Sequence, residues 1–157
     1  IMSKIKKLLA PTDYSDLSCV GLRRAFESAH DEGAELIVLH VVDMSSDWLS
    51  KHENLGPVRT LMAEQTEFLD KFLREKFATF MNLVEVRQKV ELGAAHVNIA
   101  DLAGREAVDL VIMSTHGRTG LDHILLGSVT EKVIAHAPCP VMAIPAPKRH
   151  EPLSKVA

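Results

Sequence analysis

The feature that most constrains the fold of this chain is the alternation of short apolar runs with longer segments of helical period. The apolar runs have the length of β-strands, and the segments between them repeat apolar residues every three or four positions. This alternation is typical of repeated βα units, in which helices cover a parallel sheet. The chain has 157 residues, the length of one such domain. We therefore expect a single open α/β sheet with helices on both faces.

The apolar runs and periodic segments predict five strands and four helices. The strands are expected at residues 5–10, 35–42, 84–92, 110–113 and 141–144. Ser15 caps the first predicted helix and Gly33 ends it, with a buried face of Leu17, Val20, Ala25 and Ala29. The other helices are a long one over 60–82, a short one after Gly93 that contains Val97 and Ile99, and one over 128–136. The polar stretch 43–59 is predicted to be a long loop, and the alternating residues of 84–92 predict a strand at the sheet edge.

Composition excludes several classes of protein. Five Phe, one Tyr and one Trp are too few for a base-stacking surface, so no nucleic-acid partner is expected. No apolar stretch approaches the roughly 20 residues that cross a bilayer, and no signal peptide precedes the first strand. Cys19 and Cys139 stand far apart, and the eight histidines lack metal-ligand spacing. A cytoplasmic protein without a membrane partner or a structural metal is expected.

Two loops that follow predicted strands contain the candidate functional residues. In open parallel sheets, ligands bind beyond the carboxyl ends of the strands, at the point where the strand order reverses. The first loop, residues 11–16, reads PTDYSD, and the second, residues 114–120, reads STHGRTG. Gly127 and Ser128 then open a helix, and the amides of a Gly-rich turn before a helix can bind phosphate. No Walker triplet and no GxGxxG after the first strand is present.

Each loop also has a simpler interpretation. Asp13 can be part of a helix cap, because Asp and Ser oxygens accept bonds from the free amides of a first turn. The glycines of the second loop can form ordinary turns. His116 beside Ser128 or Thr119 would suit nucleophilic catalysis, but the chain contains no GxSxG elbow. The residue pattern alone leaves these alternatives open.

The two loops together resemble the signature of the universal stress protein family, of the small, single-domain, ATP-binding type. The family has a Pro-Thr/Val-Asp turn after its first strand, as at Pro11–Asp13, and a His-Val pair at the end of its second, as at His40 and Val41. Its motif G-x-x-G, nine residues, G-S/T matches Ser114 to Gly117 followed by Gly127 and Ser128. The ending HAPCPVMAI is also similar to that of the family. The resemblance assigns residues 1–145 to one domain and 146–157 to a solvated tail.

The resemblance implies a five-stranded parallel sheet in the order 3-2-1-4-5, Rossmann-like and similar to the adenine nucleotide alpha hydrolases. It implies that both loops meet at one site for ATP, with AMP or ADP as alternatives, and that Mg²⁺ accompanies the phosphates. The positions around the adenosine, ribose and phosphates, completed by their neighbours in the two loops, are Pro11, Thr12, Asp13, Val41, Met113, Ser114, Thr115, His116, Gly117, Arg118, Gly120, Gly127, Ser128, Val129 and Thr130.

The departure from the motif is Ser114, where the family has glycine. Its side chain would either crowd the ribose or add a hydrogen bond to it. The resemblance implies a nucleotide-dependent regulator in the stress response, with an unidentified protein partner and a homodimer formed through the strand 141–144. The alternatives are a nucleotide-free interaction module of the same fold and a slow ATPase or nucleotidyl-transfer enzyme. Slow or absent hydrolysis is the expectation, because no base to orient water is evident.

Overall fold

The computed structural model describes residues 3–44, 56–116 and 126–147, and they form one parallel five-stranded sheet. The strand order is β3-β2-β1-β4-β5, as predicted. Sequence order reverses at β1, whose neighbours are β2 and β4. The strands are β1 (Lys7–Pro11), β2 (Glu35–Val42), β3 (Val86–Leu92), β4 (Leu110–Ser114) and β5 (Val141–Ile144).

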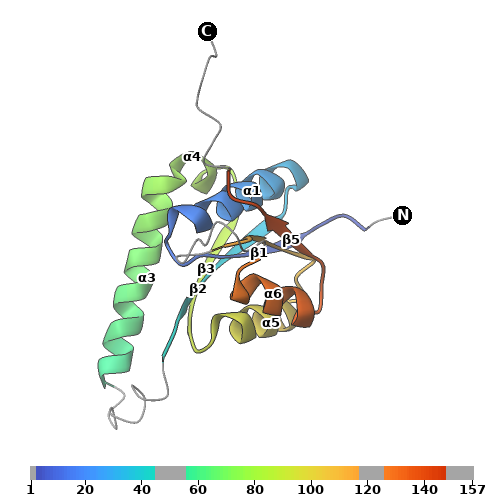
Figure 1. Ribbon diagram of the computed structural model, residues 1–157. Helices are drawn as coiled ribbons and strands as arrows, with labels where there is room; N and C mark the ends of the chain where they lie inside the picture. Colours follow the sequence, from blue (N-terminus) through green and yellow to red (C-terminus); the bar gives the residue numbers. More distant parts are fainter. Residues whose placement is uncertain (1–2, 45–55, 117–125, 148–157) are drawn as a thin grey trace.

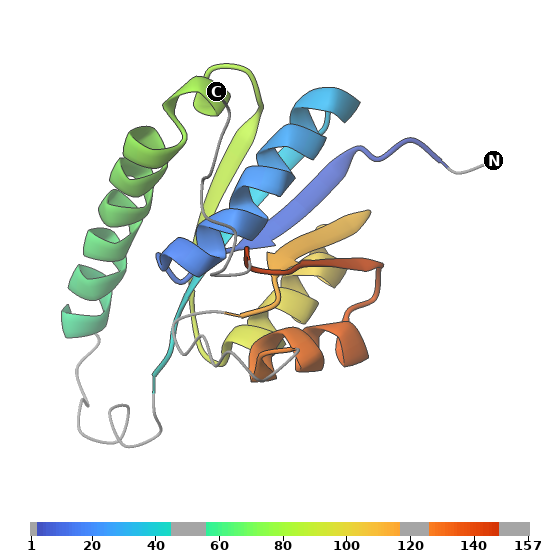
Figure 2. The same ribbon diagram turned by 45° about the horizontal axis from the view of Figure 1, so that its top comes forward.

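Helices cover both faces of the sheet, as expected (Figure 1). One face carries α1 (Asp16–Glu32), α3 (Gly56–Lys76) and α4 (Ala78–Met81), and the other carries α5 (Ala95–Arg105) and α6 (Ser128–His136). Figure 2 shows these two layers on opposite sides of the strands. None of the helices that the structure describes is both long and apolar enough for a membrane span.

Alternate residues of the central strands supply two separate cores. Leu8 of β1 and Leu36 of β2 pack under α1 and α3, whereas Leu9 and Ile37 pack under α5 and α6. Successive side chains of a strand point to opposite faces, so a strand that is covered on both sides needs apolar residues at every position. This explains the continuous run of β2, which is fully buried from Leu36 to Leu39.

The first helix begins and ends where the sequence predicts, but its buried face differs. Ser15 accepts a bond from the amide of Ser18, and Gly33 ends the helix in the left-handed conformation at φ 62°. Leu22 and Phe26 are fully buried, while Leu17 and Val20 stay partly exposed. The helix packs chiefly against β4 and β1, so its side toward the sheet edge is not covered. The expected burial of Leu17 and Val20 was therefore wrong.

The single helix predicted over 60–82 is two helices. α3 starts at Gly56, inside the predicted loop, because Pro57 fits the first turn, where no amide donor is needed. Phe77 leaves the helical conformation (φ −132°, ψ 30°), and its ring stacks on Phe26 with centroids 5.0 Å apart. Burial of this ring in the core accounts for the break before α4. Most of the predicted loop, residues 45–55, lies outside the described residues.

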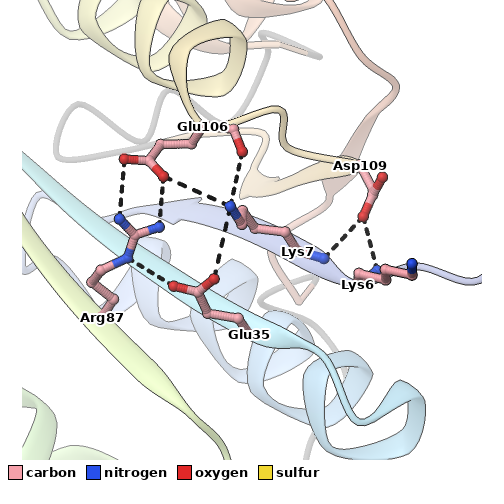
Figure 3. A network of polar contacts seen from close by, with 6 residues as sticks. All are labelled: Lys6, Lys7, Glu35, Arg87, Glu106 and Asp109. Atoms are coloured by element: carbon pink, nitrogen blue, oxygen red, sulfur yellow. Dashed lines mark hydrogen bonds and ion pairs between the residues drawn. The ribbon is translucent and has the colours of Figure 1, made fainter.

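Charged side chains tie together the amino ends of the strands (Figure 3). The Arg87 guanidinium donates to both Glu106 oxygens, at 3.0 and 2.7 Å, and to Glu35 at 2.7 Å. The amides of Lys6 and Lys7 donate to the Asp109 carboxylate. The hydrogen bonds that Arg87 donates to Glu106 lower the pKa of Glu106 and raise the pKa of Arg87. We call this group the Arg87 cluster; it lies at the end of the sheet opposite to the two candidate loops.

Candidate functional site

The loops after β1 and β4 meet at the carboxyl edge of the sheet around a cavity of about 410 Å³. This is the position where sequence order reverses, and α/β sheets bind their ligands there. The volume lies in the range of small-molecule sites. The cavity is lined by Pro11, Thr12, Asp13, Ser18, Leu39, Val41, Asp43, Ala95, Ile99, Met113, Ser114, His116, Gly127, Ser128, Val129 and Thr130.

Buried polar side chains gather at this same edge. The buried polar residues among those described are Thr12, Ser18, His40, Ser114, Thr115 and Thr130, and all of them belong to these loops or to the elements next to them. A buried hydroxyl is costly unless it is hydrogen-bonded, and satisfied networks of this kind hold a structure rigid. Hydrogen bonds of these side chains with one another and with the main chain fix the walls of the cavity.

The loop after β1 is held by its own hydroxyl and carboxylate groups. The Thr12 hydroxyl bonds that of Ser18 (2.9 Å) and accepts from the amide of Tyr14 (3.1 Å). The Asp13 carboxylate accepts from both the amide and the hydroxyl of Ser15, which caps α1. Asp13 therefore takes part in the helix cap through Ser15, and it also lines the cavity. A role in the cap and a place in the candidate site are both compatible with its position.

An aromatic cluster that the sequence did not predict stands beside this loop. Tyr14 has a left-handed backbone (φ 66°), which is uncommon for a residue with a bulky side chain. Its ring stacks on His40 at 4.2 Å and meets Phe68 and Phe72 edge-on at 4.7 and 5.1 Å. The His40 Nδ1–H donates to the Thr12 carbonyl (2.8 Å), so the cluster is tied to the first loop.

A second cavity, of about 520 Å³, lies beside the first. It is lined by Asp13, Tyr14, His40, Val41, Val42, Asp43, Gln65, Phe68 and Ala95. Four of these residues, Asp13, Val41, Asp43 and Ala95, also line the first cavity. The two cavities therefore adjoin, with Ala95 of the first turn of α5 between them.

The loop after β4 is closed at its base by main-chain bonds. The Gly127 amide donates to the Thr115 carbonyl (2.6 Å), and a Cβ at Gly127 would lie 3.0 Å from that oxygen. Glycine suits this close approach. The Thr130 hydroxyl donates to the Ser114 carbonyl (2.9 Å), which fixes the first turn of α6 against β4. Among the described residues no side chain caps α6, so the amides of its first turn can donate hydrogen bonds to an anion in the cavity.

The Ser114 hydroxyl is directed to α1. It accepts from the Gly21 amide (2.8 Å) and donates to the Leu17 carbonyl. A hydroxyl has a single donor, and that donor is committed here. It is therefore not available to donate to a ribose, which was one of the two possibilities considered from the sequence.

Charge in the described lining is acidic rather than basic. Asp13 and Asp43 are the carboxylates, and among the described lining residues no Lys or Arg is present. Lys132 of α6 is exposed and does not line the cavity. The described residues hold no cluster of three or more His, Cys, Asp or Glu side chains arranged for a metal ion. Within this part of the chain, the helix and loop amides supply the attraction for an anion.

Most of the predicted site residues lie in this lining. Thr115 does not line the cavity; it is buried, and its hydroxyl bonds His116 Nδ1 at 2.9 Å. Gly117, Arg118 and Gly120 lie outside the described residues. The predicted residues that line the cavity are Pro11, Thr12, Asp13, Val41, Met113, Ser114, His116, Gly127, Ser128, Val129 and Thr130.

Sequence reasoning missed five lining residues: Ser18, Leu39, Asp43, Ala95 and Ile99. Asp43 follows β2 directly, so its place at a strand end could have been noticed. Ala95 and Ile99 are four residues apart and share one face of α5, whose first turn follows β3 at the same edge of the sheet. That signal becomes visible only once β3 is known to lie beside β2.

Fold and site together define a parallel α/β domain with a cavity at its topological switch point. The model of the Universal stress protein family matches residues 4–145. The universal stress protein MJ0531 of Methanocaldococcus jannaschii is 34% identical over 154 residues, covering 92% of this chain and 84% of that protein. The chain belongs to the universal stress protein family.

Solved structures of this family share the fold. That of MJ0577, a universal stress protein of the same organism, has a TM-score of 0.73 at 29% identity and covers 93% of this chain and 99% of its own. A universal stress protein in complex with cAMP has a TM-score of 0.64 and covers 92% and 100%. A family member from Arabidopsis thaliana with AMP bound has a TM-score of 0.53 and covers 95% and 97%. The last two are each 20% identical to this chain, which places them with it by fold.

Proposed function

We propose that this protein binds an adenine nucleotide, ATP in the first instance, in the cavity at the carboxyl edge of its sheet. The observation that carries the proposal is the meeting of three features at one place: the switch point, the cavity of about 410 Å³ and the uncapped first turn of α6. Family members solved with cAMP and with AMP support the choice of an adenine nucleotide. The bound nucleotide would act as a regulatory signal in a stress response.

The nucleotide fits the cavity in one orientation better than in the other. Apolar residues, among them Val41, Ile99 and Met113, suit the base and ribose, and the amides of Ser128 and Val129 in the first turn of α6 suit the phosphates. Asp13 can accept from a ribose hydroxyl. Mg²⁺ bound by the phosphates would neutralise part of their charge, and Asp13 and Asp43 are the carboxylates of the described lining that could contact it.

Titration of nucleotide-stripped protein tests the proposal. We expect ATP at about 100 times its dissociation constant to stabilise the fold by about 2.7 kcal/mol, which raises Tm by about 5 to 10 °C. ADP, AMP and cAMP, measured with and without Mg²⁺, establish which phosphates contribute, and GTP is the control for the base. Absence of any shift with every adenine nucleotide at millimolar concentration would favour the nucleotide-free interaction module. Phosphate release in the same samples, and its loss in Asp13→Ala or His116→Ala, would instead favour a slow ATPase.

We further propose a homodimer formed through β5. This strand lies at the sheet edge, consists of Val141, Met142, Ala143 and Ile144, and leaves all four residues partly exposed. An unprotected apolar edge strand favours pairing with another strand, and a second copy placed across a two-fold axis would supply one.

Charged substitutions on β5 test the dimer. Val141→Asp with Ala143→Asp is expected to convert the dimer to a monomer in size-exclusion chromatography with light scattering, because two buried carboxylates would face their symmetry mates. Lys89→Glu on β3, the other edge strand, is the matched control and should remain dimeric. If the β5 variant elutes as a dimer, the interface lies elsewhere.

A further inference from the structure

Ser114 makes a contact in which its hydroxyl enters the hydrogen-bond ladder of α1. The two groups that it bonds, the Leu17 carbonyl and the Gly21 amide, are four residues apart, which is the pair that an α-helix joins by its own main-chain bond. A side chain placed between such groups fixes the position of the helix relative to the strand that bears it. Ser114 is buried, so water does not compete for these bonds.

The close approach that this contact needs is provided by Gly21. A Cβ at Gly21 would lie 2.5 Å from the Ser114 nitrogen and 2.9 Å from the Ser114 Oγ. Only a residue without a side chain allows the end of β4 to come so near to α1. The Ser114 hydroxyl and the absence of a Cβ at Gly21 therefore form one contact. This contact joins the end of β4 to α1 at Gly21.

The same residue also holds the opposite wall of the cavity. The Ser114 carbonyl accepts the Thr130 hydroxyl of α6, while its side chain holds α1. α1 follows the cap residue Ser15, which Asp13 braces, and α6 starts at Ser128, which lines the cavity proposed to hold the phosphates. Ser114 thus links the two loops. Its side chain bonds α1, which follows the first loop, and its main chain bonds α6, which follows the second.

We infer that Ser114, which stands where the family motif has glycine, is a positioning residue that pre-forms the nucleotide cavity by fixing α1 to β4. The inference rests on the proposed function, because it concerns the same site. Its hydroxyl does not touch the ligand. It restricts the motion of α1 relative to β4 before the ligand binds, so less conformational entropy is lost on binding and the affinity for the ligand is higher. Glycine at this position would keep the apolar packing of α1 on β4 but would lose both side-chain hydrogen bonds between them.

The test compares Ser114→Ala and Ser114→Gly with the unmodified protein by isothermal titration with ATP. We expect both variants to bind about three- to tenfold more weakly, the effect of losing one or two buried hydrogen bonds that hold the binding-competent geometry. If instead the serine crowds the ribose, Ser114→Gly binds more tightly than the unmodified protein. Equal affinity of all three proteins, or tighter binding by the glycine variant, overturns the inference and leaves the proposed function standing.

Two further measurements separate positioning from a general loss of stability. Hydrogen exchange along the first turns of α1 should quicken in both Ser114 variants, because the helix has lost its hydrogen bonds to β4 even where Gly21 regains the Leu17 carbonyl as acceptor, and unchanged exchange there overturns the inference. Arg87→Met, which breaks the Arg87 cluster at the far end of the sheet, should lower Tm while leaving the dissociation constant for ATP unchanged. If the unmodified protein binds no adenine nucleotide, the proposed function fails, and the role of Ser114 in binding falls with it.

Discussion

Replacing Ala95 by tryptophan is expected to weaken ATP binding by about 100-fold or more, which corresponds to about 2.7 kcal/mol, while the protein stays folded. Ala95 lies in the first turn of α5, where the two cavities adjoin, and it lines both. An indole at this position would fill much of a cavity of about 410 Å³ and exclude a nucleotide from it. Ala95 is only partly buried and lies at the border of the core on this face, so we expect the indole to enter the cavity and the helix to be kept. Isothermal titration measures the affinity, and circular dichroism verifies the fold.

Val97→Trp is the matched control for this experiment. Val97 lies two residues further along the same turn, is 47% exposed and lines neither cavity. A tryptophan there adds the same bulk to α5 without entering the site, so binding should be unchanged. If Ala95→Trp binds ATP as the unmodified protein does, the nucleotide does not occupy this cavity.

Gly21→Ala is expected to lower the free energy of unfolding by about 1 to 3 kcal/mol, the usual cost of overpacking a core. In an ordinary helix interior the same change raises stability, by up to about 1 kcal/mol. Here the added Cβ would meet main-chain atoms, the Ser114 nitrogen at 2.5 Å and the Met113 carbonyl carbon at 2.7 Å. Main-chain atoms of a buried strand cannot rotate away, so α1 must move from β4. Denaturation by urea measures the change.

The control is Gly104→Ala, in the last turn of α5. A Cβ at Gly104 would come no nearer than 3.7 Å to another atom, the Cγ of Pro138. This substitution should leave stability unchanged or raise it slightly, because only the helical preference of alanine acts. Opposite signs for the two variants would establish that the close approach of α1 and β4 constrains Gly21. A Gly21→Ala protein as stable as the unmodified one would contradict that conclusion.

Much of the fold was predictable because local patterns determine it. β2, α6 and β5 have the predicted bounds, since each is an unbroken apolar run or a periodic segment between clear stop signals such as Gly33 and Pro138. The site could be located because two loops follow strands that meet at a switch point. The residues of these loops could be identified as soon as the strands before them were placed correctly.

The remainder depends on contacts between distant parts of the chain. Phe77 ends α3 because its ring is buried against Phe26, and helical periodicity carries no information about that partner. Arg87 looked like one exposed residue of an edge strand, yet it pairs with Glu106 and Glu35 from two other segments. The direction of the Ser114 hydroxyl likewise depended on a glycine 93 positions earlier.

The position of the Arg87 cluster affects which mutations this domain can tolerate during evolution. Ion pairs and hydrogen bonds connect the strands at the amino edge of the sheet, and none of them involves a group at the carboxyl edge. Mutations in the loops after β1 and β4 leave these bonds intact, so the stability that the bonds contribute is kept while those loops change. The same separation makes the carboxyl edge a suitable place for grafting foreign loops onto this scaffold.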